Sequence, residues 1–143
     1  MKKIPPCLSN LYEVSQALFD ADKMLKAMKA ASGKSDLSSG IQFLEGRIQE
    51  LADQQARLSG EAERFLEPIR AKNNRDYLCI KLHFFLCCSW PEVAEYLGID
   101  RDDPAKTASM SAYRAIETAK EYHKEIGTRE DPSNAERDVN QNG

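Results

Sequence analysis

The sequence predicts an all-α protein: an antiparallel coiled-coil helical hairpin, then three shorter helices that pack together, then a disordered C-terminal tail. Two observations predict this class. Apolar residues recur at alternating steps of three and four along two long stretches, as in the seam of a coiled coil. No segment alternates apolar and polar residues for long enough to predict a β-strand.

Composition and charge exclude several classes of protein. The chain has 143 residues, enough for one domain or two very small ones, with 20 Lys and Arg against 23 Asp and Glu. A net charge of −3 excludes a histone-like protein that coats nucleic acid, and 4 cysteines are too few for a disulfide-stapled secreted domain. The longest apolar stretch, 78–90, is too short to cross a membrane. Pro5 and Pro6 stand where a signal peptide would have its apolar core, so we expect a cytoplasmic protein with reduced thiols.

The first helix is expected from Leu8 to Ala31. Its seam consists of Leu11, Val14, Leu18, Ala21, Leu25 and Met28. A polar loop bounded by glycine, 32–40, follows it.

The second helix is expected to begin at Ile41 and to end or kink at Pro68. Its seam consists of Ile41, Leu44, Ile48, Leu51, Gln55, Leu58, Ala62 and Phe65. Two seams of similar length with a short connection predict a hairpin domain over residues 1–68. Gln55, the one polar residue of this seam, indicates control of register, and we expect that the hairpin can pair further into a homodimer.

Three shorter helices are expected in a second domain, 69–127. The first covers Arg75 to Phe85 and presents the apolar face Leu78, Leu82 and Phe85. The second begins at Ser89, an N-cap with Pro91 and Glu92 in the first turn, and runs to Leu97 before Gly98. The third has Asp103 as its N-cap, starts at Pro104 and runs to Ile126, where Gly127 stops it.

The last two of these helices have helix-turn-helix proportions. Ala94 is small where the two helices must cross closely, and Gly98 allows the positive φ of the turn. Val93, Leu97 and Ile99 are expected to face Ala108, Ala112, Ala115 and Ile116. The outward face of the last helix then shows Lys106, Thr107, Ser109, Met110, Ser111 and Arg114. Hydroxyls between two cations suit binding in a DNA groove, whereas the alternative is an ordinary three-helix bundle without a DNA role.

The run 89–98, Ser-Trp-Pro-Glu-Val-Ala-Glu-Tyr-Leu-Gly, with Tyr-Arg-Ala-Ile at 113–116, resembles the promoter-recognition helix-turn-helix of bacterial sigma factors. The layout over residues 8–120 also resembles a family of small phage-encoded, sigma-factor-like proteins of Gram-positive bacteria. The resemblance implies that helix 104–126 enters the major groove of double-stranded DNA. Its contact residues would be Lys106, Thr107, Ser109, Ser111 and Arg114. The role proposed for that family is regulation of transcription, with late phage genes as the candidate target and RNA polymerase as a further partner.

Two features depart from the sigma pattern. The stretch 100–103 is an insertion with three acidic residues, which would repel phosphate at the start of the reading helix. The segment 69–127 as a whole carries nine charges of each sign. Leu86-Cys87-Cys88 replaces the usual polar, glycine-containing turn, and we expect the hairpin or a partner to cover it. The acidic stretch and the balanced charge of 69–127 favour the alternative function, a protein-protein interaction module that has lost DNA binding.

Metal binding and catalysis have little basis in the sequence. Cys79, His83 and Cys87 recur at steps of four and Cys88 follows, which would suit Zn²⁺ on a continuous helix. Because free cysteines are usually buried, we expect structural cysteines and no metal or cofactor. No Ser/His/Asp or Cys/His arrangement or phosphate-binding glycine loop is present, so we expect no enzyme. Residues 128–143 have almost no large apolar side chain and are expected to form the disordered tail.

Overall fold

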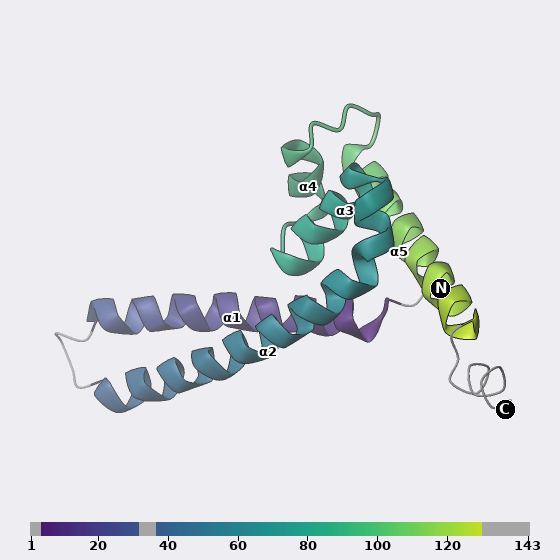
Figure 1. The fold of residues 1–143 in the computed structure, drawn as a ribbon. Coiled ribbons are helices and arrows are strands. Elements are labelled where there is room, and N and C mark those ends of the chain that lie inside the picture. Colours follow the sequence, from purple (N-terminus) through teal and green to yellow (C-terminus); the bar gives the residue numbers. More distant parts are fainter. Residues whose placement is uncertain (1–3, 32–36, 130–143) are drawn as a thin grey trace, which may run out of the picture.

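The computed structural model describes residues 4–31 and 37–129 (Figure 1). These residues form five α-helices and one π-helical turn, and no strand occurs among them. The all-α class is therefore confirmed for the described part of the chain. The elements are α1 (Pro6–Ala31), α2 (Ser38–Lys72), α3 (Asn74–Ile80), the π-helical turn η1 (Lys81–Phe85), α4 (Trp90–Tyr96) and α5 (Pro104–Arg129). None of the described helices combines the length and apolarity that crossing a membrane requires.

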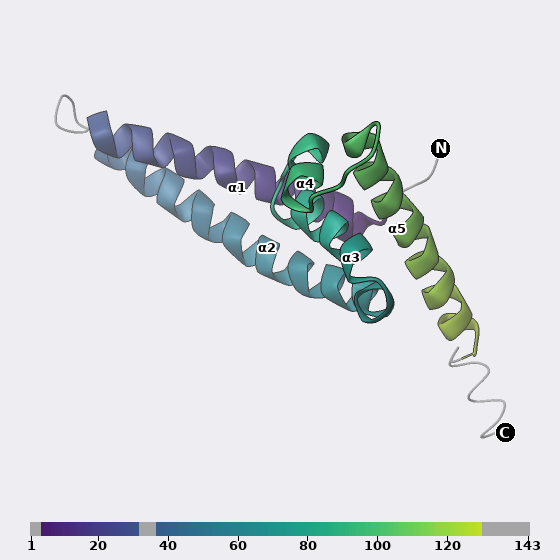
Figure 2. The same cartoon turned by 90° about the horizontal axis from the view of Figure 1, so that it is seen from above.

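Helices α1 and α2 lie side by side along their length (Figures 1 and 2). Late residues of α1 lie against early residues of α2, since Lys29 forms an ion pair with Glu45 at 3.4 Å. Farther along, Gln55 Nε2 donates a hydrogen bond to the buried Ser15 Oγ at 2.9 Å. All residues of both predicted seams are buried or half-buried, as the spacing predicts. At the end of the second seam, Leu66, which the pattern did not include, is fully buried, whereas the predicted Phe65 is half-buried.

The predicted start of α2 is wrong, and of the two predictions for Pro68, an end or a kink of the helix, the end is wrong. The helix begins at Ser38, inside the expected loop, and continues past Pro68 to Lys72. Proline lacks an N–H and so removes one helical hydrogen bond. Burial of Leu66 and Ile69 on either side of Pro68 offsets that loss. The helix ends instead at Asn73, whose backbone is extended and whose side chain caps α3 by accepting from Asp76 N at 3.1 Å.

The short helix predicted over Arg75–Phe85 is present as α3 and η1, but its predicted apolar face is only partly correct. Phe85 is buried, whereas Leu78 and Leu82 are half-buried. The buried hydrophobic side chains of this segment are Tyr77, Cys79, Ile80, Phe84 and Phe85. More than one face is covered because α1, α2 and α5 all contact this segment, and the wider π turn brings two consecutive phenylalanines to the core.

One buried cluster, which we call the inner core, joins all the helices. Its members are Leu8, Leu11, Leu58, Ala62, Leu66, Ile69, Tyr77, Cys79, Ile80, Phe84, Phe85, Val93, Ala94, Ala108, Ala112, Ala115, Ile116 and Ala119. A smaller outer cluster of Ala21, Leu44 and Leu51 lies farther out between α1 and α2. The inner core thus contains residues from both predicted domains, and the predicted boundary after residue 68 falls within α2.

The last helix is longer than predicted. α5 runs through Gly127 to Arg129 rather than stopping at Ile126. One glycine costs about 1 kcal/mol of helix propensity, which does not by itself end a helix. The expected tail began at Thr128, so its first two residues are helical, and 130–143 lie outside the described residues.

Candidate nucleic-acid interface

The start of α4 is fixed by the predicted capping box. Ser89 Oγ accepts from Glu92 N at 3.3 Å, and Ser89 N donates back to Glu92 Oε1 at 2.8 Å. Pro91 occupies the first turn, where its missing N–H leaves no partner unsatisfied. The first residues of this segment therefore determine where α4 begins.

The end of α4 is fixed by Gly98. Its φ of 63° is in the left-handed region, which glycine adopts without steric cost. Gly98 N donates to Glu95 O at 3.1 Å and Ile99 N donates to Ala94 O at 3.0 Å. These two bonds are those of a Schellman motif, which reverses the chain direction directly after the helix. The predicted role of this glycine is confirmed.

The connection from α4 to α5 contains the acidic insertion. Residues 100–103 are all exposed. Asp103 caps α5, because its Oδ1 accepts from Lys106 N at 3.2 Å. α5 then packs on α4 through small side chains, with Ala94, Ala108 and Ala112 all buried. These alanines let the two helices approach closely, as their positions in the sequence predict.

The predicted contact residues lie on α5 in three different environments. Lys106 and Arg114 are exposed, while Thr107 and Ser109 are half-exposed. Ser109 Oγ donates to Lys106 O at 3.0 Å, so its hydroxyl hydrogen bonds within its own helix. The placement of Ser111 on the outward face is wrong: it is only 2% exposed.

Ser111 is buried because α3 covers it. Arg75 Nη2 at the start of α3 donates to Ser111 Oγ at 3.3 Å. Thr107, Ser111 and Arg114 follow the i, i+4, i+7 spacing and share one face of α5, whereas Ser109 lies toward the opposite flank. The structure thus brings together only part of the predicted set.

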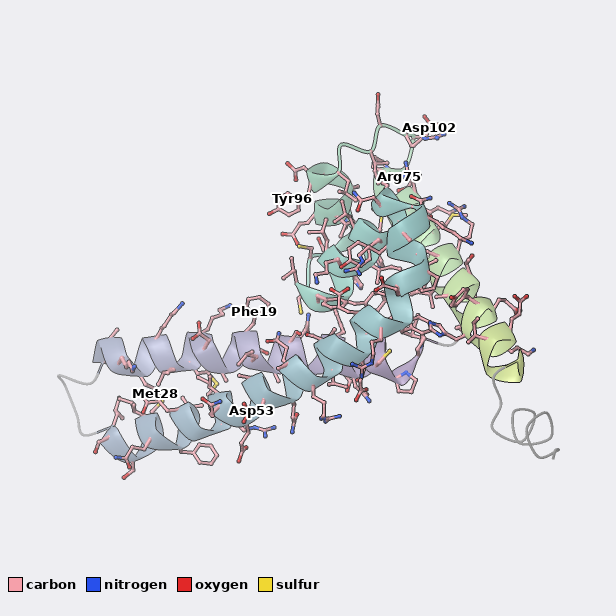
Figure 3. All side chains as sticks on the ribbon, in the orientation of Figure 1. Phe19, Met28, Asp53, Arg75, Tyr96 and Asp102 are labelled. Carbon is pink, nitrogen blue, oxygen red and sulfur yellow. The ribbon has the colours of Figure 1, made fainter. Side chains whose placement is uncertain are left out.

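Two arginines that the sequence did not single out join this face. A shallow hollow of about 240 Å³ is lined by Arg75, Arg101, Thr107, Met110, Ser111 and Arg114. Figure 3 shows Arg75 close to the connection that carries Asp102, at the end of the molecule away from the outer parts of α1 and α2. Within the described residues, none of these three arginines takes part in an ion pair.

The sequence contained a weak signal for both arginines. Arg75 lies in the first turn of α3, where acidic residues are the usual choice, and Arg101 stands between two aspartates. In the sequence, Asp76 follows Arg75 and two aspartates flank Arg101, so the net charge around each arginine is not positive. Only the packing of α3 against α5 places them together.

The turn 86–88 is partly covered by α1, as one of the two predictions for it states. The ring of His83 stacks between Trp90, with ring centroids 3.8 Å apart, and Tyr12 of α1, at 5.0 Å. His83 Nδ1 lies 2.7 Å from Cys88 O and donates to it, because a carbonyl only accepts. Burial lowers the pKa of His83 from its usual value, so the ring is neutral at pH 7. Leu86 remains exposed.

The cysteines near this turn point to separate places. Cys79 is buried in the inner core, and Cys87 Sγ lies 3.9 Å from the carbonyl oxygen of Tyr12. Burial raises the pKa of Cys79, Cys87 and Cys88, which disfavours the thiolate that binds metals. Across the described part of the chain, no group of three or more His, Cys, Asp or Glu side chains is arranged to hold a metal ion.

Comparison with known proteins finds no matching protein family, curated protein or solved structure.

Proposed function

We propose that this chain is a phage-type, sigma-like DNA-binding regulator of transcription that acts on double-stranded DNA in the cytoplasm. In this proposal α4 and α5 form a helix-turn-helix, and α5 enters the major groove. Helices α1 and α2 form an antiparallel coiled-coil hairpin that pairs with a second copy or docks on RNA polymerase.

The observation that carries the proposal is the way α5 is presented. Its start is capped by Asp103 and its inner face is fixed on α4 by alanines, so the opposite face is rigid and open. That face carries Lys106 and Arg114, with Met110 54% exposed between them. Cations on a rigid helix suit phosphates and guanine edges, and an apolar side chain suits thymine methyl groups. Ser111, being buried, acts through Arg75 rather than by touching DNA.

The alternative is a protein-protein interaction module, and a different observation favours it. Phe19, Met24 and Phe43 are large apolar side chains on α1 and α2 that are more than half exposed, Phe43 at 72%. Exposed apolar side chains of this size can be buried by a protein that binds the hairpin. They also fit the regulator, because a coiled-coil hairpin that docks on polymerase needs such a surface.

The experiment is a fluorescence anisotropy titration of the chain against a labelled duplex taken from DNA upstream of its own gene. We expect binding at about 50 mM salt that weakens steeply as salt rises. Lys106→Ala should weaken binding to all sequences alike, whereas Arg114→Ala should weaken one sequence most if Arg114 reads a base.

The matched control is Lys26→Ala, which removes an exposed α1 lysine that pairs with Asp22 at 3.0 Å. It should leave DNA binding unchanged. If the wild-type chain does not bind at about 50 mM salt, where a few phosphate contacts suffice for detection, the regulator proposal is wrong and the interaction module takes its place.

A further inference from the structure

The hollow at the start of α3 has a composition that the proposed groove contacts of α5 do not explain. Its three arginines come from three elements: Arg75 from α3, Arg101 from the α4–α5 connection and Arg114 from α5. The other lining side chains are two hydroxyls and a methionine, and none is acidic. All three arginines line one hollow, and none of them forms an ion pair with a carboxylate of the described residues, so an anion bound there would meet cations that are not already paired.

One of these arginines is already held in position. Arg75 donates to Ser111 Oγ, and because Ser111 is buried its hydroxyl cannot move far. A side chain fixed in this way loses less entropy on binding than a free surface arginine. The guanidinium also keeps further N–H donors that point away from Ser111 and remain available.

The size of the hollow limits the ligand. At about 240 Å³ it is smaller than the usual range for small-molecule sites, which begins near 300 Å³. A single phosphate group fits this space, and arginine forks match phosphate oxygens in pairs. The hollow also borders the open face of α5, since Thr107, Met110 and Arg114 belong to both.

We propose that this hollow seats one phosphodiester group of the DNA backbone and so fixes the register of α5 in the groove. The inference rests on the proposed function. It gives the insertion 100–103 a second role, because the same segment that adds acidic residues supplies Arg101 to the seat.

The test measures how DNA affinity depends on salt concentration. This dependence reports the number of phosphates that the protein neutralises, not the number of arginines that neutralise them. Each neutralised phosphate contributes about 0.9 to the slope of log affinity against log salt. The variants are Arg75→Gln, Arg101→Gln and Arg114→Gln, singly and together. If all three share one phosphate, the triple variant lowers the slope by about one, and the effects of the single variants on affinity do not add.

The control is the double variant Arg47→Gln/Arg57→Gln on α2. These arginines are exposed, are paired with Glu50 and Glu61 at 3.2 and 3.5 Å, and do not line the hollow. The double variant should keep the wild-type slope of log affinity against log salt. Ser111→Ala, which releases Arg75 without changing the charge, should weaken binding less than Arg75→Gln and leave the slope unchanged.

The outcomes separate the inference from the proposed function. Wild-type binding with an unchanged slope in the triple variant overturns the seat and leaves the DNA-binding proposal intact. If the triple variant lowers the slope by about three and the effects of the single variants on affinity add, the arginines make three separate phosphate contacts, which also overturns the single seat. Absence of wild-type binding overturns both. Circular dichroism of each variant checks that the helices are retained.

Discussion

The outer and inner halves of the α1–α2 pair are formed by the same two helices but bury very different amounts of side chain. The outer cluster has three buried residues, whereas the inner core has eighteen, because α3, η1 and α5 pack on the inner half and α4 packs in turn on α5 and η1. A helix in the outer half is covered on one face only. Side chains on its other faces, such as Met24 and Phe43, stay exposed.

This difference separates stability from recognition. Local unfolding requires less free energy where few apolar contacts are lost, so the outer half should open without the rest of the molecule. The inner half holds α4 and α5 in place and thereby fixes the face that we propose for DNA. The outer half, which has fewer buried contacts, is where we propose that a protein partner docks.

The largest effect is expected from Leu66→Ala. Leu66 is fully buried in the inner core, and truncating a buried leucine to alanine costs about 3–5 kcal/mol when the cavity cannot collapse. Neighbours from several helices surround the site, so we expect a cost near the upper end and a single cooperative transition. Urea denaturation followed by circular dichroism measures it. A loss below about 1 kcal/mol would contradict the description of one shared core.

Leu51→Ala is the matched change in the outer half. Leu51 is also buried in α2, but its cluster has only two other buried members. The thin two-helix layer can relax around the cavity, so we expect a smaller cost of about 2–3 kcal/mol. Amide hydrogen exchange should show faster exchange confined to the outer parts of α1 and α2. Equal acceleration in α5 would mean that the two halves unfold as one unit.

Gly98→Ala compares the turn after α4 with an ordinary helical position. The positive φ of Gly98 is costly for alanine, by about 1–2 kcal/mol, although an added Cβ would meet no atom within 4 Å. Gly46 in the outer half of α2 is the control, since a Cβ there also meets open space and its backbone is helical. Gly46→Ala should stabilise the protein by about 1 kcal/mol. In thermal melts we expect Gly98→Ala to lower the melting temperature and Gly46→Ala to raise it.

Much of this fold is encoded locally and could be predicted from the sequence. The seams of α1 and α2, the capping box at Ser89 and the turn at Gly98 depend on residues within a few positions of one another. The shared inner core and the length of α2 beyond Pro68 could not be predicted in this way. Both depend on which helices pack on α2, and a periodic pattern does not contain that information.

The candidate site divides in the same way. Lys106 and Arg114 were predicted on an exposed face because helical spacing places them there. Ser111 was misplaced because the helix that covers it begins with Arg75, 36 residues earlier. Such a pairing follows from the docking of α3 on α5, so neither the burial of Ser111 nor the hollow beside it could be predicted from local patterns.

The smallest effect is expected in the pH dependence of stability, at His83 of η1, which stacks between Tyr12 of α1 and Trp90 of α4. Burial lowers the pKa of His83, so the unfolded chain binds a proton more readily than the folded one. The free energy of unfolding should therefore decrease as the pH falls below the usual histidine value of 6.5. Glu63 affects stability at lower pH. Its burial favours the neutral form, but hydrogen bonds from Lys81 and Tyr77 outweigh this effect and lower the pKa of Glu63 from 4.5. The stability that the charged Glu63 contributes is therefore lost only when the pH falls below 4.5. His83→Gln keeps a donor for Cys88 O and does not titrate, and urea denaturation between pH 7 and pH 5 should then give a flatter profile than wild type. An identical decline in the two proteins would show that the Tyr12–His83–Trp90 stack does not link α1 and α4 through a neutral histidine.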